Sequence, residues 1–152
     1  MRTFFKIFVP IILIFAFGLP IYSKKETSVN DLLILNNNFY QKLFRTPSIE
    51  RDNYLNNNLN KVIQTRGIIT KIDKEGRYNK KYRIILVDQV AKYAKLKIQY
   101  YIFIDDEDSI NILAENETFE FSGQLVACTP VNTRRDSYIF DIIFEKGAVI
   151  VK

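Results

Sequence analysis

The sequence contains no histidine, no tryptophan and a single cysteine among its 152 residues. Without histidine, Ser-His-Asp and Cys-His catalytic groups, histidine-ligated zinc and the usual proton shuttle near neutral pH are excluded. One cysteine forms neither an intramolecular disulfide nor a cysteine-rich zinc site. Glycine-rich phosphate loops, nucleophile elbows and metal-ligand arrays are also missing. We therefore expect a protein that is not an enzyme and that binds no metal and no cofactor.

The residues that are present suit a small folded protein. Hydrophobic residues make up 47% of the chain and aromatic residues 14%, which is ample for a core. The length allows one compact domain with a short appendage. The net charge is +5, from 22 Lys and Arg against 17 Asp and Glu.

The first 23 residues have the organisation of a secretory signal peptide. Arg2 and Lys6 precede the apolar run Ile7–Phe17, and small or helix-breaking residues follow up to Ser23. Cleavage after Gly18 and cleavage after Ser23 both fit. The alternative is an uncleaved membrane anchor, but the apolar stretch is shorter than the ~20 residues that a spanning helix needs.

Cleavage has consequences for location and charge. It predicts a secreted or periplasmic protein without a membrane span. Removal of residues 1–23 takes away two basic residues and no acidic residue, so the net charge falls from +5 to +3.

Residues 24–60 are rich in asparagine and are expected to form a helical segment. Ser28 is placed to cap a helix that ends before Pro47. Its apolar stripe recurs at helical spacing and consists of Leu32, Leu35, Phe39 and Leu43. A second short helix is expected over Pro47–Leu59, with Ile49, Tyr54 and Leu55 facing inward.

From Lys61 onward the hydrophobic period changes to two, which predicts strands. The predicted strands are Val62–Ile72, Tyr82–Asp88, Leu96–Ile104, Glu117–Ala127 and Tyr138–Glu145, the last extended by Ala148–Val151. Gly67 marks a bulge or bend in the first strand. Asp73–Lys81 is expected to be a polar turn around Gly76, and Asp105–Ala114 a short helical turn.

This order resembles the OB-fold, in particular the bacterial tRNA-anticodon-binding-like domains of exported proteins. The resemblance spans Lys61–Lys152. It is carried by Thr65-Arg66-Gly67-Ile68-Ile69, Tyr82-x-Ile84-x-Leu86, Leu96-x-Ile98-x-Tyr100, Leu113 and Phe119-x-Phe121-x-Gly123. The departure is Glu115-Asn116-Glu117, where such domains usually have glycine. The resemblance implies a mainly β fold, a five-stranded Greek-key barrel behind an N-terminal helical arm, and says little about activity.

Strand alternation assigns the two faces of the predicted sheet. The residues expected to point inward are Ile63, Ile69, Tyr82, Ile84, Leu86, Leu96, Ile98, Tyr100, Phe119, Phe121, Leu125, Phe140 and Ile142. The opposite parity exposes Arg83, Ile85, Lys97, Gln99, Tyr101 and Phe103. The resemblance implies that this outer face, with the loops beside it, is the ligand face.

The candidate ligand-binding residues are the basic and aromatic side chains of that face and its loops. They are Arg77, Lys80, Lys81, Arg83, Lys97, Tyr101, Arg134 and Arg135. Basic groups around exposed rings suit an anionic chain. The competing interpretation is structural: the N-terminal helix covers Tyr101 and Phe103, and the charges are merely solvated.

These features predict an exported, non-enzymatic binding module. Its ligand would be a protein or an anionic polymer, either an oligosaccharide or a nucleic acid, and export disfavours nucleic acid. The alternative is a structural envelope protein that docks on a partner through its helix or a sheet edge. Cys128 is expected to be buried or half-buried. The acidic run at Asp105–Asp108 lacks calcium-loop spacing and is expected to start a solvated helix.

Overall fold

A computed structural model of the chain describes residues 32–88 and 95–144. The predicted signal peptide, the Ser28 cap, the connection 89–94 and the strand extension 148–151 lie outside these ranges. Within them, no helix has both the length and the apolarity needed to cross a membrane.

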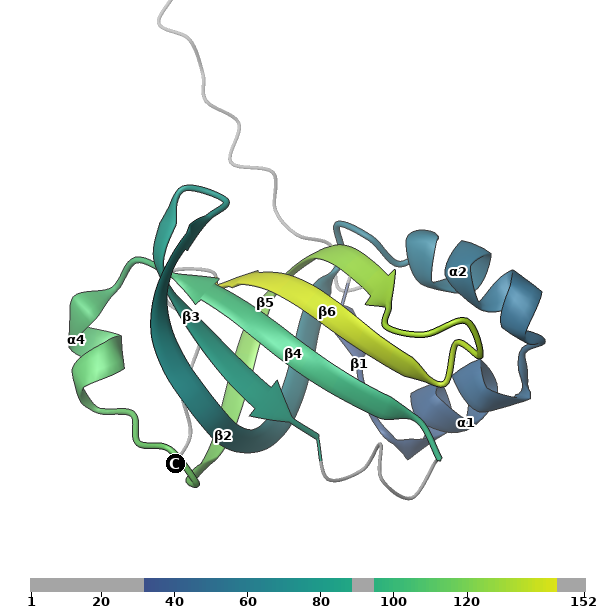
Figure 1. Cartoon of the computed structure of the whole chain (residues 1–152), viewed down its shortest axis with the longest axis horizontal. Helices are drawn as coiled ribbons and strands as arrows, with labels where there is room; N and C mark the ends of the chain where they lie inside the picture. Colours follow the sequence, from purple (N-terminus) through teal and green to yellow (C-terminus); the bar gives the residue numbers. More distant parts are fainter. Residues whose placement is uncertain (1–31, 89–94, 145–152) are drawn as a thin grey trace, which may run out of the picture.

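The described part is mainly β, as expected, and is built on one mixed sheet of six strands (Figure 1). The strands are β1 (Leu32–Ile34), β2 (Val62–Arg77), β3 (Lys80–Val87), β4 (Lys97–Ile104), β5 (Thr118–Pro130) and β6 (Ser137–Phe144). Their order is β1-β2-β3-β4-β6-β5, and β5 pairs with β2 as well. The five predicted strands are therefore present as β2 to β6, and β1 is an addition.

Strand β2 exchanges partners halfway along its length. Its first half, Val62–Ile68, is antiparallel to β5, whereas its second half pairs with β3 from Ile68 onward. Gly67 lies at this exchange, where a Cβ would stand 2.8 Å from the carbonyl oxygen of Val87. The strand curves strongly here (Figure 1), in agreement with the bend that the glycine predicted.

The turn after β2 is shorter than the sequence suggested. The predicted loop Asp73–Lys81 around Gly76 is wrong, because β2 continues to Arg77 and Arg77 pairs with Lys80. The turn consists of Tyr78 and Asn79, with φ of 56° and 57°. The polar residues before it extend the ladder because Asp73 pairs with Arg83 across the hairpin.

The predicted first helix is wrong over residues 32–36. Leu32–Ile34 forms β1, parallel to the start of β2, and α1 (Asn37–Arg45) begins only afterwards. Asn36 caps it, since its Oδ1 accepts from the backbone N–H groups of Asn38 and Phe39 at 3.1 and 3.2 Å. β3 leaves this edge of β2 unpaired, and β1 supplies the missing backbone partners.

The second predicted helix is present as α2 (Ser48–Asn56). Leu55 is buried as expected, but Ile49 is 77% exposed, so its inward assignment is wrong. Arg51 sets the inward face of α2, and Ile49 lies two residues away, about 200° around the helix. The short helix predicted after the third strand is α4 (Glu107–Asn111), whose first turn contains Glu107 and Asp108 of the acidic run.

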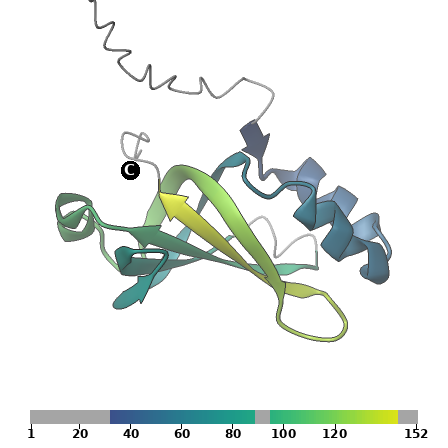
Figure 2. The ribbon, with the colours of Figure 1, turned by 90° about the horizontal axis from the view of Figure 1, so that it is seen from above.

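Every strand residue predicted to point inward is buried. These side chains form one core together with Phe39, Tyr40 and Leu43 of α1 and Leu55 of α2. Figures 1 and 2 place α1 and α2 beyond one end of the strands and α4 at the opposite end. The described helices therefore lie at the two ends of the curled sheet.

A buried polar cluster fastens α1 to this core. Tyr40 donates to Asp88 at the end of β3 and contacts the hydroxyl of Tyr100. Tyr100 also donates to Asp88 at 3.0 Å, and Thr65 donates to it at 3.4 Å. Because buried carboxylates are costly without hydrogen bonds, the cluster specifies how the helix docks.

Candidate functional site

The outer face of the sheet is covered at one end by its own β2–β3 hairpin. Phe103, predicted to be exposed, is fully buried. The Tyr78 ring packs edge-on against it, with ring centroids 5.0 Å apart, and the Arg77 guanidinium lies 5.7 Å from the same ring. The expected exposure of Phe103 is therefore wrong, and the cover is the hairpin tip and not the N-terminal helix.

Asp141 of β6 completes this contact. It is 5% exposed although strand parity points it outward beside Tyr101. Its Oδ2 accepts from the Tyr78 hydroxyl at 2.8 Å and from Arg77 Nη1 at 3.2 Å. Burial and the neighbouring carboxylate raise the pKa of Tyr78 to about 12, so its hydroxyl stays a hydrogen-bond donor at neutral pH.

Arg83 is neutralised on the same face. Its guanidinium makes two hydrogen bonds to Asp73, at 3.0 and 2.7 Å, and an ion pair with Glu75. It also lies 4.9 Å above the ring of Tyr101, which is half-buried. Arg83 and Tyr101 are thus in contact, as a common site requires, but the charge of Arg83 is already matched.

Lys80 and Lys81 gather around Asp105. Lys80 Nζ lies 3.1 Å from its carboxylate, and the Lys81 backbone N–H donates to it at 2.9 Å. The hydrogen bond from Lys80 is the main cause that lowers the pKa of Asp105. Four of the eight predicted ligand residues, Arg77, Lys80, Lys81 and Arg83, therefore belong to the hairpin.

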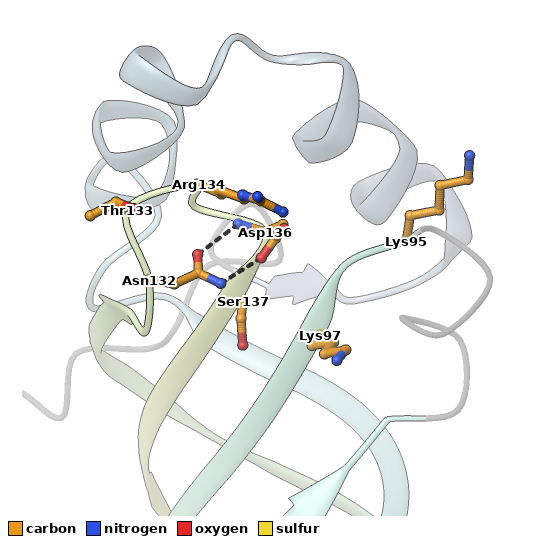
Figure 3. A pocket seen from close by; sticks show the side chains of 7 residues that line it. All are labelled: Lys95, Lys97, Asn132, Thr133, Arg134, Asp136 and Ser137. Carbon is orange, nitrogen blue, oxygen red and sulfur yellow. Dashed lines mark hydrogen bonds between the residues drawn. The ribbon is translucent and has the colours of Figure 1, made fainter.

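A second basic group lies at the other end of β4, around a hollow of about 450 Å³ (Figure 3). Lys95 and Lys97 border it on one side, and Arg134 lies opposite on the loop between β5 and β6. Within residues 32–88 and 95–144, none of these three cations forms an ion pair. Three cations and one carboxylate, that of Asp136, therefore line this hollow.

The loop that carries Arg134 is held by its own turn. Asn132 Nδ2 donates to Asp136 Oδ1 at 2.7 Å, as Figure 3 shows, and the Arg135 N–H donates to the Asn132 carbonyl at 3.1 Å. Among the described residues that line this hollow, Asp136 is the one carboxylate, and the hydrogen bond from Asn132 holds it in the turn. The three cations outnumber it, so the hollow keeps a positive balance.

Arg135, the last predicted site residue, faces the helices. Its guanidinium pairs with Asp52 at 3.2 Å and donates to the Ser48 carbonyl at 3.3 Å. Its carbonyl accepts from Arg51 Nη1 at 2.6 Å. Arg135 therefore positions the loop, while its neighbour Arg134 is exposed.

The structure thus divides seven of the eight predicted site residues into two groups, one near Lys97 and one near Phe103. Six residues of extended strand separate these two positions, which corresponds to about 20 Å. Sequence reasoning missed Lys95, Asn132 and Asp136 at the hollow, and Asp141 on the face. Asn132 and Asp136 could have been found in the sequence because their spacing within a loop is typical of a turn. Asp141 could have been found because it is a carboxylate inside an otherwise apolar strand.

Other chemistry is limited. No group of three or more potential metal ligands occurs among the residues that the structure describes. Cys128 is half-buried, as predicted. Burial, with a contribution from Asp141, raises the pKa of its thiol to about 12, so the reactive thiolate is scarce at neutral pH.

Comparisons with known proteins show no matching family model and no matching curated protein. Among solved structures, the chain resembles a Klebsiella pneumoniae lipoprotein provisionally assigned to nucleic-acid binding, with 15% identity, a TM-score of 0.48, and coverage of 84% of this chain and 98% of the other. The chain also resembles DNA-binding domain A of Saccharomyces cerevisiae replication protein A. The identity is 18%, the TM-score is 0.36, and the match covers 59% of this chain and 80% of that domain.

Asparaginyl-tRNA synthetase of Entamoeba histolytica, solved with asparaginyl-adenylate, gives 14% identity, a TM-score of 0.36, and coverage of 60% of this chain but 21% of the enzyme. Similarities this low concern the fold at most, and function has to be argued from the site itself.

Proposed function

We propose that this chain is a non-enzymatic binding module of OB type that holds an anionic polymer. The closed cycle of pairings from β2 through β3, β4, β6 and β5 back to β2, with β4 and β6 parallel, supports a five-stranded barrel. Export, predicted from residues 1–23, belongs to the proposal and rests on the sequence.

One observation carries the choice of ligand. Lys95, Lys97 and Arg134 surround a hollow, and none of them is paired with a carboxylate within the described ranges. An anionic chain bound there releases its counterions and gains three favourable contacts. From Lys97 it can continue along the outer face of β4, past Gln99 to Tyr101.

The non-enzymatic part of the proposal is supported by the placement of the buried carboxylates. Asp88 lies in the interior with Tyr40 and Tyr100, whereas Asp141 lies on the outer face. They form no convergent pair of the kind that acid–base catalysis uses.

The docking alternative loses much of its support. Of the predicted helix stripe, Leu35, Phe39 and Leu43 are at most 6% exposed and pack in the core. Leu32 is 43% exposed, but it lies in β1 and not on the helix. We do not propose docking at the β1 edge.

The test is binding of two labelled probes, a short oligothymidylate and a heparin-derived oligosaccharide, at several salt concentrations. We expect at least one probe to bind, with a slope of log affinity against log salt of about −2 for three contacts. Lys97→Gln and Arg134→Gln should each weaken binding several-fold and reduce the steepness of that slope.

Arg66→Gln is the matched control, because Arg66 is exposed on β2, which is not adjacent to β4. Salt-independent binding, or equal losses in all three variants, contradicts the proposal.

A further inference from the structure

Phe103 and Asp141 are buried where their strand positions predict exposure. Both lie on the outer face of neighbouring parallel strands, β4 and β6. Gln99, on the same face of β4, is exposed, and Tyr101 is half-buried. The hairpin tip contacts both of them, through Tyr78 and Arg77.

The tip is a thin and solvent-exposed cover. The Arg77 side chain is 49% exposed and Tyr78 38% exposed, although their inner ends touch buried groups. The contact consists of one aromatic pair, one cation–π contact, one hydroxyl–carboxylate hydrogen bond and one ion pair. Contacts of this number and exposure are weak enough to open without unfolding of the sheet.

The backbone conformation of the tip is unfavourable for the residue that occupies it. Two-residue hairpin turns with positive φ at both positions prefer Asn, Asp and Gly. Tyr78, with φ of 56°, is a bulky aromatic residue in a conformation that such residues rarely adopt. A residue in such a conformation points to a role for its side chain, and this side chain lies on Phe103 and Asp141.

We propose that the hairpin tip is a displaceable cover and that Phe103 and Asp141 beneath it form a subsite for a planar ring with a hydrogen-bond donor. Tyr78 shows which chemistry fits, because it supplies a ring edge-on to Phe103 and a donor 2.8 Å from Asp141. A second acceptor is available, since the buried Oδ1 of Asp141 has no hydrogen-bond partner within the described ranges.

The inference rests on the proposed function, since the ring is carried by the same anionic polymer. Of the anionic polymers proposed as ligands, a single-stranded nucleic acid is the one that carries planar rings with donor groups. The chemistry of this subsite therefore favours nucleic acid, although the predicted export argues against it. A strand anchored at Lys97 and Arg134 reaches Phe103 along about 20 Å of β4. A base of this strand then competes with Tyr78 for the subsite. Because only molecules with an open tip can bind the base, the measured affinity equals the intrinsic affinity multiplied by the open fraction.

The experiment compares an oligothymidylate with an abasic strand of the same length and charge, on wild type and on Tyr78→Asn. Asparagine suits positive φ, so the variant keeps the turn and removes the ring and hydroxyl. We expect Tyr78→Asn to bind the oligothymidylate about tenfold more tightly than wild type. In the variant, the base no longer has to displace the aromatic contact with Phe103 and the hydrogen bond to Asp141 that Tyr78 makes. Binding of the abasic strand should not change.

Two further measurements separate a competing cover from a structural turn. Asn79→Gly changes the neighbouring turn residue but retains Tyr78. It should alter neither the affinity for the oligothymidylate nor the affinity for the abasic strand. Phe103→Leu, added to Tyr78→Asn, keeps an apolar core and should abolish the preference for the base-bearing strand. Without ligand, amide exchange in the hairpin should be faster in Tyr78→Asn than in wild type.

The outcomes are distinguishable. If both strands bind with the expected salt dependence but Tyr78→Asn leaves the oligothymidylate affinity unchanged or weaker, the cover is disproved and the proposed function stands. If neither strand binds and only the oligosaccharide does, the anionic site stands and the ring subsite is disproved. If no probe binds, the proposed function fails and this inference fails with it.

Discussion

At the scale of single residues, carboxylate partners decide which basic side chains are available. Arg77, Lys80, Arg83 and Arg135 each have an acidic partner. These ion pairs reduce the field that a ligand experiences. Lys97 and Arg134 have no ion pair in the described ranges, so less of their charge is offset.

The Asp73 carboxylate provides a pH-dependent test of one such pair. Hydrogen bonds from Arg83 are the main cause that lowers its pKa in the folded protein. Its stabilising effect is therefore complete above the ordinary Asp value of about 4 and is lost as the pH falls through the lower folded value. We expect Asp73→Asn to reduce the free energy of unfolding by about 1 kcal/mol at neutral pH. The reduction should be smaller near pH ~3, below the ordinary Asp value.

Urea denaturation at the two pH values measures this difference. Glu117→Gln is the control, because Glu117 is exposed and has no ion pair among the described residues. Equal losses for Asp73→Asn at both pH values would mean that the carboxylate charge is not what matters.

At the scale of secondary-structure elements, two glycines allow the strands to approach closely. A Cβ at Gly123 of β5 would lie 2.6 Å from the Ile143 carbonyl oxygen and 2.7 Å from Ile142 Cγ2. At Gly67 of β2 the corresponding neighbour is the Val87 carbonyl oxygen. Neither neighbour is the flexible end of a long side chain, so the strands themselves would have to move.

Gly123→Ala should therefore destabilise the protein by about 2 kcal/mol, the usual cost of overpacking. Gly76→Ala is a matched control in β2, because its Cβ would have only one atom nearby, at 4.0 Å. We expect the control to change stability by less than about 0.5 kcal/mol. Chemical denaturation of both variants measures the contrast, and similar effects at the two positions would contradict the close-approach argument.

At the scale of the whole molecule, one buried arginine connects the helical segment to the candidate site. Arg51 of α2 donates to the carbonyls of Leu43 and Thr46 at 3.1 and 3.0 Å. It donates to those of Phe44 and Arg135 at 2.9 and 2.6 Å. The same guanidinium thus ends α1 and holds the loop that carries Arg134.

Arg51→Lys keeps the charge but cannot supply this set of donors. We expect it to lower the free energy of unfolding by about 2 kcal/mol, because buried carbonyls lose their partners. It should also weaken polymer binding at temperatures where the variant is fully folded, since the loop is no longer held. Arg45→Lys, at an exposed position on α1, is the control for both measurements. Unchanged binding in folded Arg51→Lys would show that Arg134 does not depend on this link.

The sequence by itself determined the strands and their faces. Every predicted inward residue from Ile63 to Ile142 is buried, because alternation is local and a buried face tolerates no shift of one residue. The basic and aromatic content of the outer face followed from the same parity.

Only the tertiary structure decided what covers that face and which charges are free. Leu32–Ile34 became β1 because a distant strand edge lacked partners, which overrode a helical pattern. Tyr78 reaches Phe103 and Asp141 only after the hairpin folds over two other strands, and Lys95 joins Arg134 only because β4 lies beside β6. Pairings between distant segments depend on how the whole sheet closes, and no local pattern of residues encodes that closure.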